Sequence, residues 1–324
     1  MMRRGLSIII LMALPLLVAS DPIAPPEHRR GEEQTYLTFP EWFLVFSPAE
    51  YAQFVQHEQP SAFPFWGHIG QFWESYRAVH GATVEKGYPF NGGYHVMIMV
   101  IGTSTTVEYA IRSAYETLVG RLAELTVSGR TAEDDFGAKV AQDYVDFIRE
   151  RPWYEFDFWS RITGLWSDVS WSGPGFIRKL ERRYALTSEY LVKAGYGWLI
   201  GKGTQAGYER PLFVTAVVTN ESQGKQLHLL PRYEPFTSAA TQLARGGADF
   251  VEVAGNPAEA DVLISVLASQ QWNAPMNSRV LFTQDVITQP DTRRFAIVVS
   301  VGELARTLRT LEQSEARIEH LFDY

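Results

Sequence analysis

Tryptophan is distributed very unevenly along this chain of 324 residues. Eight of the nine tryptophans lie between Trp42 and Trp198, and Trp272 is the ninth. The last third of the chain contains instead short runs of valine, isoleucine, leucine and alanine. Such a change in composition predicts two cores of different architecture. Because the chain contains no cysteine, no disulfide can brace either core, and both depend on packing.

Residues 1–20 have the layout of an export signal. Arg3 and Arg4 precede an apolar run over residues 5–19, and the small residue Ser20 ends it. As a helix this run would be roughly 24 Å long, which is shorter than the ~30 Å hydrocarbon core of a bilayer. We therefore expect a cleaved signal peptide, with an uncleaved N-terminal anchor as the alternative. Either one places the rest of the chain in the periplasm or on the periplasmic face of the inner membrane.

Composition and turn signals divide the remainder of the chain into four segments. Residues 21–34 are rich in proline and charge, and they predict an extended tether. Residues 35–200 predict a mainly helical, aromatic-rich domain. A glycine-containing linker is expected over residues 201–211, followed by a second domain over residues 212–324.

Helical periodicity and capping residues predict five helices in the aromatic-rich domain. Ser47 with Glu50 forms a capping pattern that opens one helix, and Thr131 with Asp134 opens another. The expected ranges are 47–57, 65–79, 96–125, 131–149 and 177–200.

The longest of these predicted helices carries an apolar row, which we expect to be buried. A second membrane span is the alternative for the first part of this helix. The apolar row consists of Val107, Ala110, Ile111, Ala114, Leu118, Leu122 and Leu125.

Charged residues at helical spacing predict solvated helix faces. Glu108, Arg112 and Glu116 follow one another at intervals of four residues. If the helices pack tightly, such a row would instead form a buried polar seam. The basic stretch Arg178, Lys179, Arg182 and Arg183 also predicts a solvated face, with contact to anionic lipid as the alternative.

The C-terminal domain alternates between β-branched runs and helical patterns. The order strand-helix-strand occurs twice, and it predicts a ferredoxin-like α+β sandwich with an additional hairpin. The fold class is therefore α+β, with a helical domain first. Strands are expected over residues 226–233, 250–254, 262–268, 280–287, 294–300 and 318–322, and helices over 236–245 and 302–313.

One stretch of this sequence has the residue types of a carbohydrate-acting site. Glu155 and Asp157 alternate with aromatic residues between Trp153 and Trp159. Paired carboxylates can carry out acid-base hydrolysis of a glycosidic bond, and aromatic faces stack on sugar rings. The alternative is a half-buried loop packed on the helical domain.

Trp42 and Trp66 are the other candidate binding residues. Each lies next to proline or glycine, where an exposed tryptophan can form a binding platform or a membrane-interface anchor. The alternative for both is a role in covering the core.

The sequence contains no recognisable cofactor, nucleotide or metal motif, and we predict neither a cofactor nor a metal site. The seven histidines never occur at the four-residue spacing that places two imidazoles on one helix face. A net charge of −8 argues against nucleic acid as a partner. No motif ties the chain to a characterised family.

These observations predict a non-catalytic binding or scaffolding protein of the bacterial cell envelope. Its partner would be another envelope or membrane protein, or a glycan or lipid ligand. A hydrolase that acts on envelope glycan or lipid is one alternative, and an integral membrane helical bundle is another.

Overall fold

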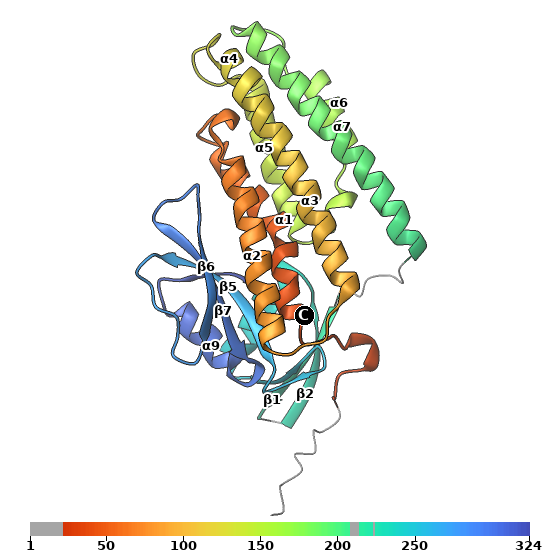
Figure 1. The fold of residues 1–324 in the computed structure, drawn as a ribbon, viewed down its shortest axis with the longest axis vertical. Helices are drawn as coiled ribbons and strands as arrows, with labels where there is room; N and C mark the ends of the chain where they lie inside the picture. The colour runs from red at the N-terminus through yellow and green to blue at the C-terminus, as the bar shows by residue number, and fades with distance from the viewer. Residues whose placement is uncertain (1–21, 208–213, 223) are drawn as a thin grey trace, which may run out of the picture.

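The computed structural model describes residues 22–207, 214–222 and 224–324, and it confirms the predicted α+β fold class. A helical region stands on an α+β region that contains all of the described strands (Figure 1). The helices of the first region are α1 (Gln34–Phe54), α2 (Phe65–Glu85), α3 (Gly92–Tyr115), α4 (Arg121–Glu124), α5 (Ala132–Ile148), α6 (Phe158–Ser167) and α7 (Phe176–Gly207). Shorter turns are η1 (Pro26–His28), η2 (Pro60–Ala62), η4 (Trp153–Glu155) and the π-helical turn η3 (Glu116–Gly120).

Helix α1 is the central helix of this region, because apolar residues cover all of its sides. Tyr36, Phe39, Phe43 and Phe46 are buried, and α1 packs against α2, α3, α5 and one strand. A helix that is hydrophobic all round is a buried helix. It begins well before the predicted start at Ser47, whose side chain is buried inside it.

Two of the expected helix features can be compared directly with the structure. The capping box of Thr131 and Asp134 is present at the start of α5, with both hydrogen bonds formed. By contrast, α7 continues to Gly207, so that residues 201–207 of the predicted linker are helical. Residues 208–211 of that linker lie outside the described residues.

The α+β region contains two four-stranded antiparallel sheets, with strand orders β2-β1-β3-β4 and β6-β7-β5-β8. Its elements are β1 (Val214–Glu221), β2 (Gly224–Pro231), α8 (Glu234–Arg245), β3 (Asp249–Val253), β4 (Asn256–Pro257), β5 (Asp261–Ser269), β6 (Arg279–Asp285), β7 (Thr292–Ser300), η5 (Val301–Glu303), α9 (Leu304–Glu312) and β8 (Arg317–Leu321).

The two sheets are built from the same β-β-α-β unit, a repeat that the sequence did not reveal. In the first sheet β1 lies between β2 and β3, which α8 connects; in the second, β5 lies between β7 and β8, which α9 connects. Both central strands have a register shift, at Val218/Thr219 and at Ser265/Val266. A ferredoxin-like sandwich has one sheet. Here the strands divide between two, because the unpredicted strand β1 pairs with β2 and β3.

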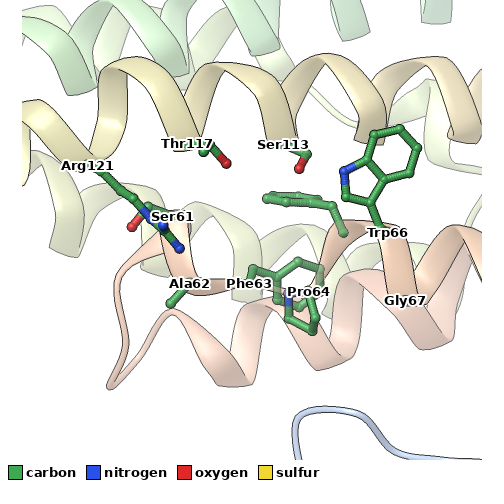
Figure 2. Close-up of a pocket in the computed structure, with 10 residues that line it drawn as sticks. Ser61, Ala62, Phe63, Pro64, Trp66, Gly67, Ser113, Thr117 and Arg121 are labelled. Atoms are coloured by element: carbon green, nitrogen blue, oxygen red, sulfur yellow. The ribbon is translucent and has the colours of Figure 1, made fainter.

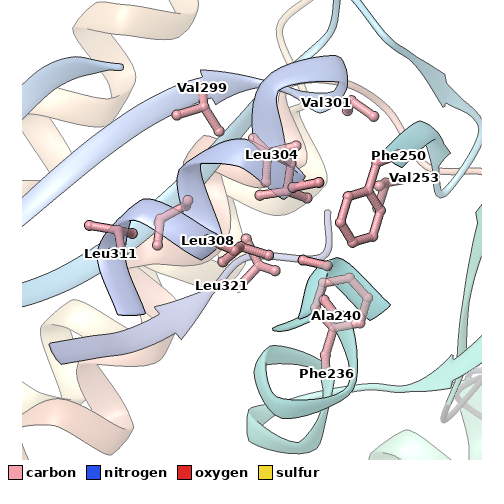
Figure 3. Close-up of a cluster of buried hydrophobic side chains, with 14 of the residues drawn as sticks. Phe236, Ala240, Phe250, Val253, Val299, Val301, Leu304, Leu308, Leu311 and Leu321 are labelled. Carbon is pink, nitrogen blue, oxygen red and sulfur yellow. The ribbon is translucent and has the colours of Figure 1, made fainter. Parts of the chain in front are cut away.

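Helices α8 and α9 share one core with both sheets (Figure 3). Phe236 from α8 and Leu308 from α9 are fully buried there, together with Phe250 of β3 and Ile264 of β5.

The opposite face of the second sheet packs against α1 and α2. Leu263 and Val298 point into a cluster with Phe39 and Val79. Because both faces of this sheet are covered, β5 and β7 are buried along most of their length. The helical and α+β regions are therefore joined by a packed interface.

The segment 22–33 is docked on the α+β region, which differs from the extended tether expected over residues 21–34. The backbone N–H groups of Ile23 and Ala24 donate to the Glu252 carboxylate at 2.8 and 2.7 Å. Arg30 donates to the backbone oxygen of Tyr324 at 3.0 Å and pairs with Asp323 at 3.3 Å. The predicted signal over residues 1–20 lies outside the described residues.

Candidate functional site

Glu155 and Asp157, the candidate acid-base pair, are exposed and lie in local turns. Glu155 ends the turn η4, and Asp157 caps α6, its Oδ1 accepting a hydrogen bond from the backbone N–H of Ser160 at 3.0 Å. The stretch is thus a turn followed by a helix start, and not the extended segment that would place both carboxylates on one face. Neither residue lines either of the two cavities given below.

The tryptophans of that stretch and Trp42 have different surroundings. Trp153 stacks on Tyr196 with ring centroids 5.6 Å apart, whereas Trp159 is exposed on α6. Trp42 is half-buried, and its ring lies 3.5 Å from that of His320 on β8. It therefore packs between the helical region and the second sheet.

Trp66 lies on the surface and lines a cavity of about 320 Å³ (Figure 2). Its side chain is 63% exposed. Residues from the η2–α2 segment form one wall, and three polar residues from the opposite rod of α3, η3 and α4 form the other. A second cavity, of about 420 Å³, is lined by Gln56, Arg130, Asp135, Ala138, Lys139, Gln142 and Asp143.

A buried Ser-His-Glu cluster lies where α1, α2 and α3 meet the second sheet. The Ser47 hydroxyl lies 3.0 Å from Nδ1 of His68 and 2.7 Å from the hydroxyl of Tyr109. His68 Nε2 lies 3.6 Å from Glu50, which pairs with Arg294 on β7 at 3.0 Å. Burial, together with the charge of Arg294, lowers the pKa of His68 to about 3.

These contacts resemble the order of a nucleophile, a base and an acid, but the residues are inaccessible. Ser47, His68 and Glu50 are all buried. A catalytic serine has to reach its substrate, so this arrangement serves as a polar cross-link between α1 and α2. Arg294 extends the cross-link to the second sheet.

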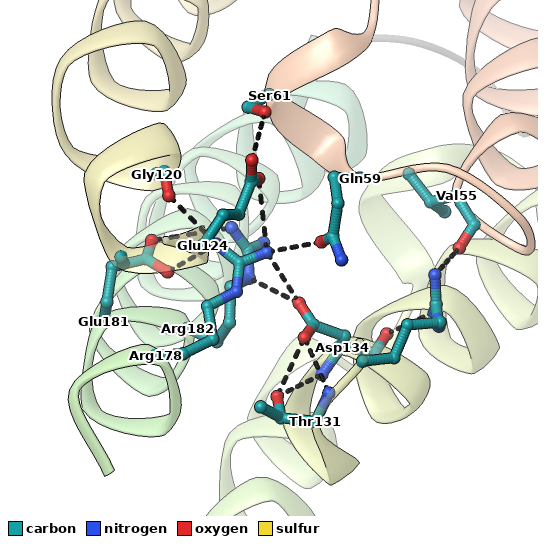
Figure 4. Close-up of polar contacts among 12 residues, drawn as sticks. Val55, Gln59, Ser61, Gly120, Glu124, Thr131, Asp134, Arg178, Glu181 and Arg182 are labelled. Atoms are coloured by element: carbon teal, nitrogen blue, oxygen red, sulfur yellow. Dashed lines mark hydrogen bonds and ion pairs between the residues drawn. The ribbon is translucent and has the colours of Figure 1, made fainter. Parts of the chain in front are cut away.

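A second buried polar cluster contains several arginines of α7 (Figure 4). Arg178 donates to Asp134 at 2.9 Å and to Glu181 at 3.0 Å, and its side chain is 0% exposed. Arg182 donates to Glu116 of the π-helical turn at 2.8 Å. Burial alone would raise the pKa of Asp134, but the adjacent Arg178 and the hydrogen bonds from Thr131 bring that pKa below its ordinary value.

Arg183 and Lys179 fix the loop before α7. Arg183 pairs with Glu133 at 2.9 Å, donates to the Val169 carbonyl and lies 3.9 Å from the ring centroid of Trp171. Lys179 donates to the carbonyl of Ser172. The predicted solvated face formed by the basic residues of 178–183 is therefore wrong, since these basic side chains are buried by η3, α4, α5 and this loop.

The charged row on α3 is also turned inward. Arg112 donates to Glu189 of α7 at 3.2 Å, and Lys193 contacts Glu189 at 2.8 Å and Glu108 at 3.4 Å. Burial would raise the pKa of Glu189, but Arg112 and Lys193 lower it to about 2. A solvated face is the wrong interpretation here as well, and the buried polar seam is the arrangement found.

The apolar row of α3 points outward, opposite to expectation, except that Ala110 is half-buried. Nine positions that repeat every eleven residues are all exposed, and Leu118 is 67% exposed. An eleven-residue repeat has 3.67 residues per turn, so that the row runs almost straight along the helix for about 44 Å. The nine residues are Val96, Val100, Thr103, Val107, Ile111, Ala114, Leu118, Leu122 and Leu125.

Helix α7, which lies beside α3, has the same polarity. Seven charged residues occur between positions 176 and 198, and none of them is exposed. The exposed positions are instead apolar or aromatic: Phe176, Ile177, Leu180, Tyr184, Leu191, Val192, Tyr196 and Trp198. We call the outward sides of α3 and α7 together the α3–α7 face.

A polar flank lies on another side of the bundle. The exposed residues of α5 include Asp135, Lys139 and Asp146. Helix α1 packs against both α3 and α5, and α5 also contacts α7, so the polar flank borders the helices whose outward sides form the α3–α7 face.

The part of the chain that the structure describes contains no group of three His, Asp or Glu side chains placed to hold a metal ion. No helix within residues 22–207, 214–222 and 224–324 has both the length and the apolar content that crossing a bilayer requires. No protein-family model, curated protein or solved structure matches the chain.

Sequence reasoning identified Trp66 but missed the groups around it and the polarity of the bundle. The eleven-residue apolar repeat and the charged row on α3 are both visible in the sequence, on different sides of one helix. Their spacing does not indicate which side faces the other helices.

Proposed function

We propose that the protein is a non-catalytic binding or scaffolding protein of the cell envelope, and that its α3–α7 face binds the surface of a lipid bilayer. The observation that supports this proposal is the reversed polarity of the bundle. Arg178, Arg182 and Arg183 are in its interior, while Leu118 and Leu122 are on its exterior. Exposed apolar surfaces of this extent mark sites of interaction with proteins or membranes.

A bilayer is favoured as the occupant because the α3–α7 face is long and nearly free of charge, and because the helical region that carries this face exposes several tryptophans. Trp66, Trp159, Trp166, Trp171 and Trp198 are all exposed on the helical region. Tryptophan is enriched where membrane meets water.

The polar flank on α5 determines the orientation that we propose. A bundle immersed in lipid would bury Asp135, Lys139 and Asp146 in hydrocarbon at high cost. Lying flat, with α3 and α7 in the plane of the interface, buries the apolar face and leaves α5 in water. The apolar run over residues 5–19 fits the same compartment, either as an export signal or as an anchor.

The hydrolase alternative has weaker support. Glu155 is on an exposed turn, and Asp157 is engaged as the cap of α6. Neither lines the cavity beside Trp66 or the cavity next to Arg130.

The absence of cysteine allows a local test of the proposal. A single cysteine is introduced by Leu118→Cys in the full chain and labelled with an environment-sensitive fluorophore. We expect its emission to shift to the blue when phosphatidylcholine vesicles are added, because the label enters lipid. Met276→Cys is the matched control, since Met276 is a fully exposed apolar residue of the α+β region and should not respond.

Two results would count against bilayer binding. A label at position 118 that does not respond to vesicles would overturn the proposal. The same holds if that label is already shielded without lipid and light scattering gives a dimer, because the face would then be covered by a second copy.

A further inference from the structure

We propose that the cavity beside Trp66 binds the phosphodiester headgroup of a glycerophospholipid. This inference rests on the proposed function, since it names the lipid group that the bundle recognises where it meets the bilayer. The cavity's volume of about 320 Å³ falls at the lower end of the range for small-ligand sites.

One wall of the cavity is a polar row on the α3–α4 rod. Ser113, Thr117 and Arg121 follow one another at intervals of four residues and so lie one above another on the same side of the rod. Figure 2 shows all three on the side of the rod that faces the η2–α2 segment. Thr117 belongs to the π-helical turn, a type of element that is frequent at functional sites.

The other wall is aromatic. Phe63 and Phe65 line the cavity and are buried. Trp66 stands at its edge with the indole nitrogen turned toward Ser113 (Figure 2). The wall thus adds an N–H donor and an apolar surface.

The donors around the cavity are free to bind a ligand. Among the described residues, the side chains of Ser113, Thr117, Arg121 and Trp66 have no hydrogen-bond or ion-pair partner. Hydroxyls in helices commonly bond to the carbonyl four residues earlier, as Thr106 does to Gly102 at 2.7 Å. A site with four unpaired donors, one of them cationic, favours a ligand group that is anionic and rich in oxygen.

Glu124, three residues after Arg121 on the same rod, does not cancel this preference, because its charge is already paired. Glu124 accepts a hydrogen bond from Ser61 at 2.8 Å and lies 3.5 Å from the buried Arg178. Arg121 is therefore the available counter-charge at this end of the bundle.

The position of the cavity favours a lipid over free phosphate. Arg121 is flanked on the same rod by Leu118, Leu122 and Leu125, which belong to the α3–α7 face. A molecule with its phosphodiester at Arg121 can therefore lay its acyl chains along the apolar row. Arginine at the margin of an apolar face, with tryptophan beside it, is placed at headgroup depth.

The test is a calorimetric titration of the full chain with dihexanoylphosphatidylglycerol below its micellar concentration. We expect Arg121→Gln to weaken binding about tenfold, as for the loss of one charge-assisted contact. Thr117→Val removes a hydroxyl at constant shape and should weaken binding by a smaller factor. Arg151→Gln is the matched control, because Arg151 is also an exposed arginine but does not line the cavity.

Equal affinity of the wild type and Arg121→Gln for this lipid would overturn the inference. Binding of inorganic phosphate as tight as that of the lipid would also overturn it, because the acyl chains would then contribute nothing. The vesicle response of the label at position 118 separates the two proposals. If that response persists in Arg121→Gln while the titration shows no effect of the substitution, the headgroup site fails and the bilayer face stands.

Discussion

Arg182 of α7 donates a hydrogen bond to Glu116 at 2.8 Å, and both side chains are buried between the two longest helical rods. This contact joins α7 to the π-helical turn that carries Thr117. The interior charges therefore hold the helices that present both the apolar face and the cavity.

The Arg182–Glu116 pair predicts a specific pattern of stability. Glu116→Leu leaves the guanidinium of Arg182 without its closest partner, and we expect the free energy of unfolding to fall by about 3 kcal/mol. The double variant Glu116→Leu/Arg182→Met removes both charges and should recover most of that loss. Urea unfolding followed by circular dichroism measures both. A double variant that is less stable than the single one would contradict this account.

Two buried histidines predict a loss of stability in mild acid. Burial lowers the pKa of His68 and of His320 to about 3, while the unfolded chain takes up these protons near pH 6.5. Between pH 6.5 and 3 the unfolded state thus binds more protons, and stability falls as the pH falls. Each histidine contributes a slope of about 1.4 kcal/mol per pH unit.

Substituting each histidine in turn shows how much it contributes to the change in unfolding free energy per pH unit. Unfolding measured between pH 6.5 and 5 should become flatter in His68→Gln and in His320→Gln, whatever their absolute stability. His57→Gln, which changes an exposed histidine, is the matched control. If stability depends on pH equally in the wild type and in all the variants, the slope does not arise from His68 and His320.

Two helical glycines predict opposite effects of the same substitution. A Cβ atom at Gly102 of α3 would overlap the ring of Phe72, so that Gly102→Ala should destabilise the protein by about 1–3 kcal/mol. A Cβ at Gly81 of α2 meets nothing within 4 Å, and Gly81→Ala should stabilise it by about 0.5–1 kcal/mol. Thermal unfolding shows whether each substitution raises or lowers stability. If both substitutions change stability in the same direction, the contact of α2 with α3 is not as described.

The candidate carboxylates predict different stability effects. Asp157→Ala removes the cap of α6 and should cost about 1 kcal/mol. Glu155→Gln changes an exposed side chain on a turn, and we expect less than about 0.5 kcal/mol. Chemical denaturation distinguishes the two. If both variants keep wild-type stability yet lose hydrolysis of an envelope glycan, the hydrolase alternative regains its support.

Features that depend on local sequence signals could be predicted, whereas features that depend on the packing partner of an element could not. The capping box at Thr131 and the helical and β-branched runs after residue 224 correspond to elements of the structure, because capping and periodicity act within one element. On α3, Val107 and Glu108 lie on different sides, and which side is buried depends on α7, more than fifty residues later. The same limit applies to strand β1, whose neighbours determine how the strands divide between two sheets.

The candidate site shows this limit most clearly. Trp66 was noticeable because it lies next to proline and glycine, but Ser113, Thr117 and Arg121 are ordinary helix residues until the fold places them opposite it.

The docking of segment 22–33 also has a consequence for the order of folding. Arg30 and its partner Asp323 are separated by 293 positions. The backbone N–H of Ala24 can form its hydrogen bond only once Glu252 has been synthesised. Synthesis proceeds from the N-terminal side, so the C-terminal partners of this segment emerge last. The native state can therefore close only after the whole chain has been released, and residues 22–33 remain unpaired with Asp323 throughout synthesis.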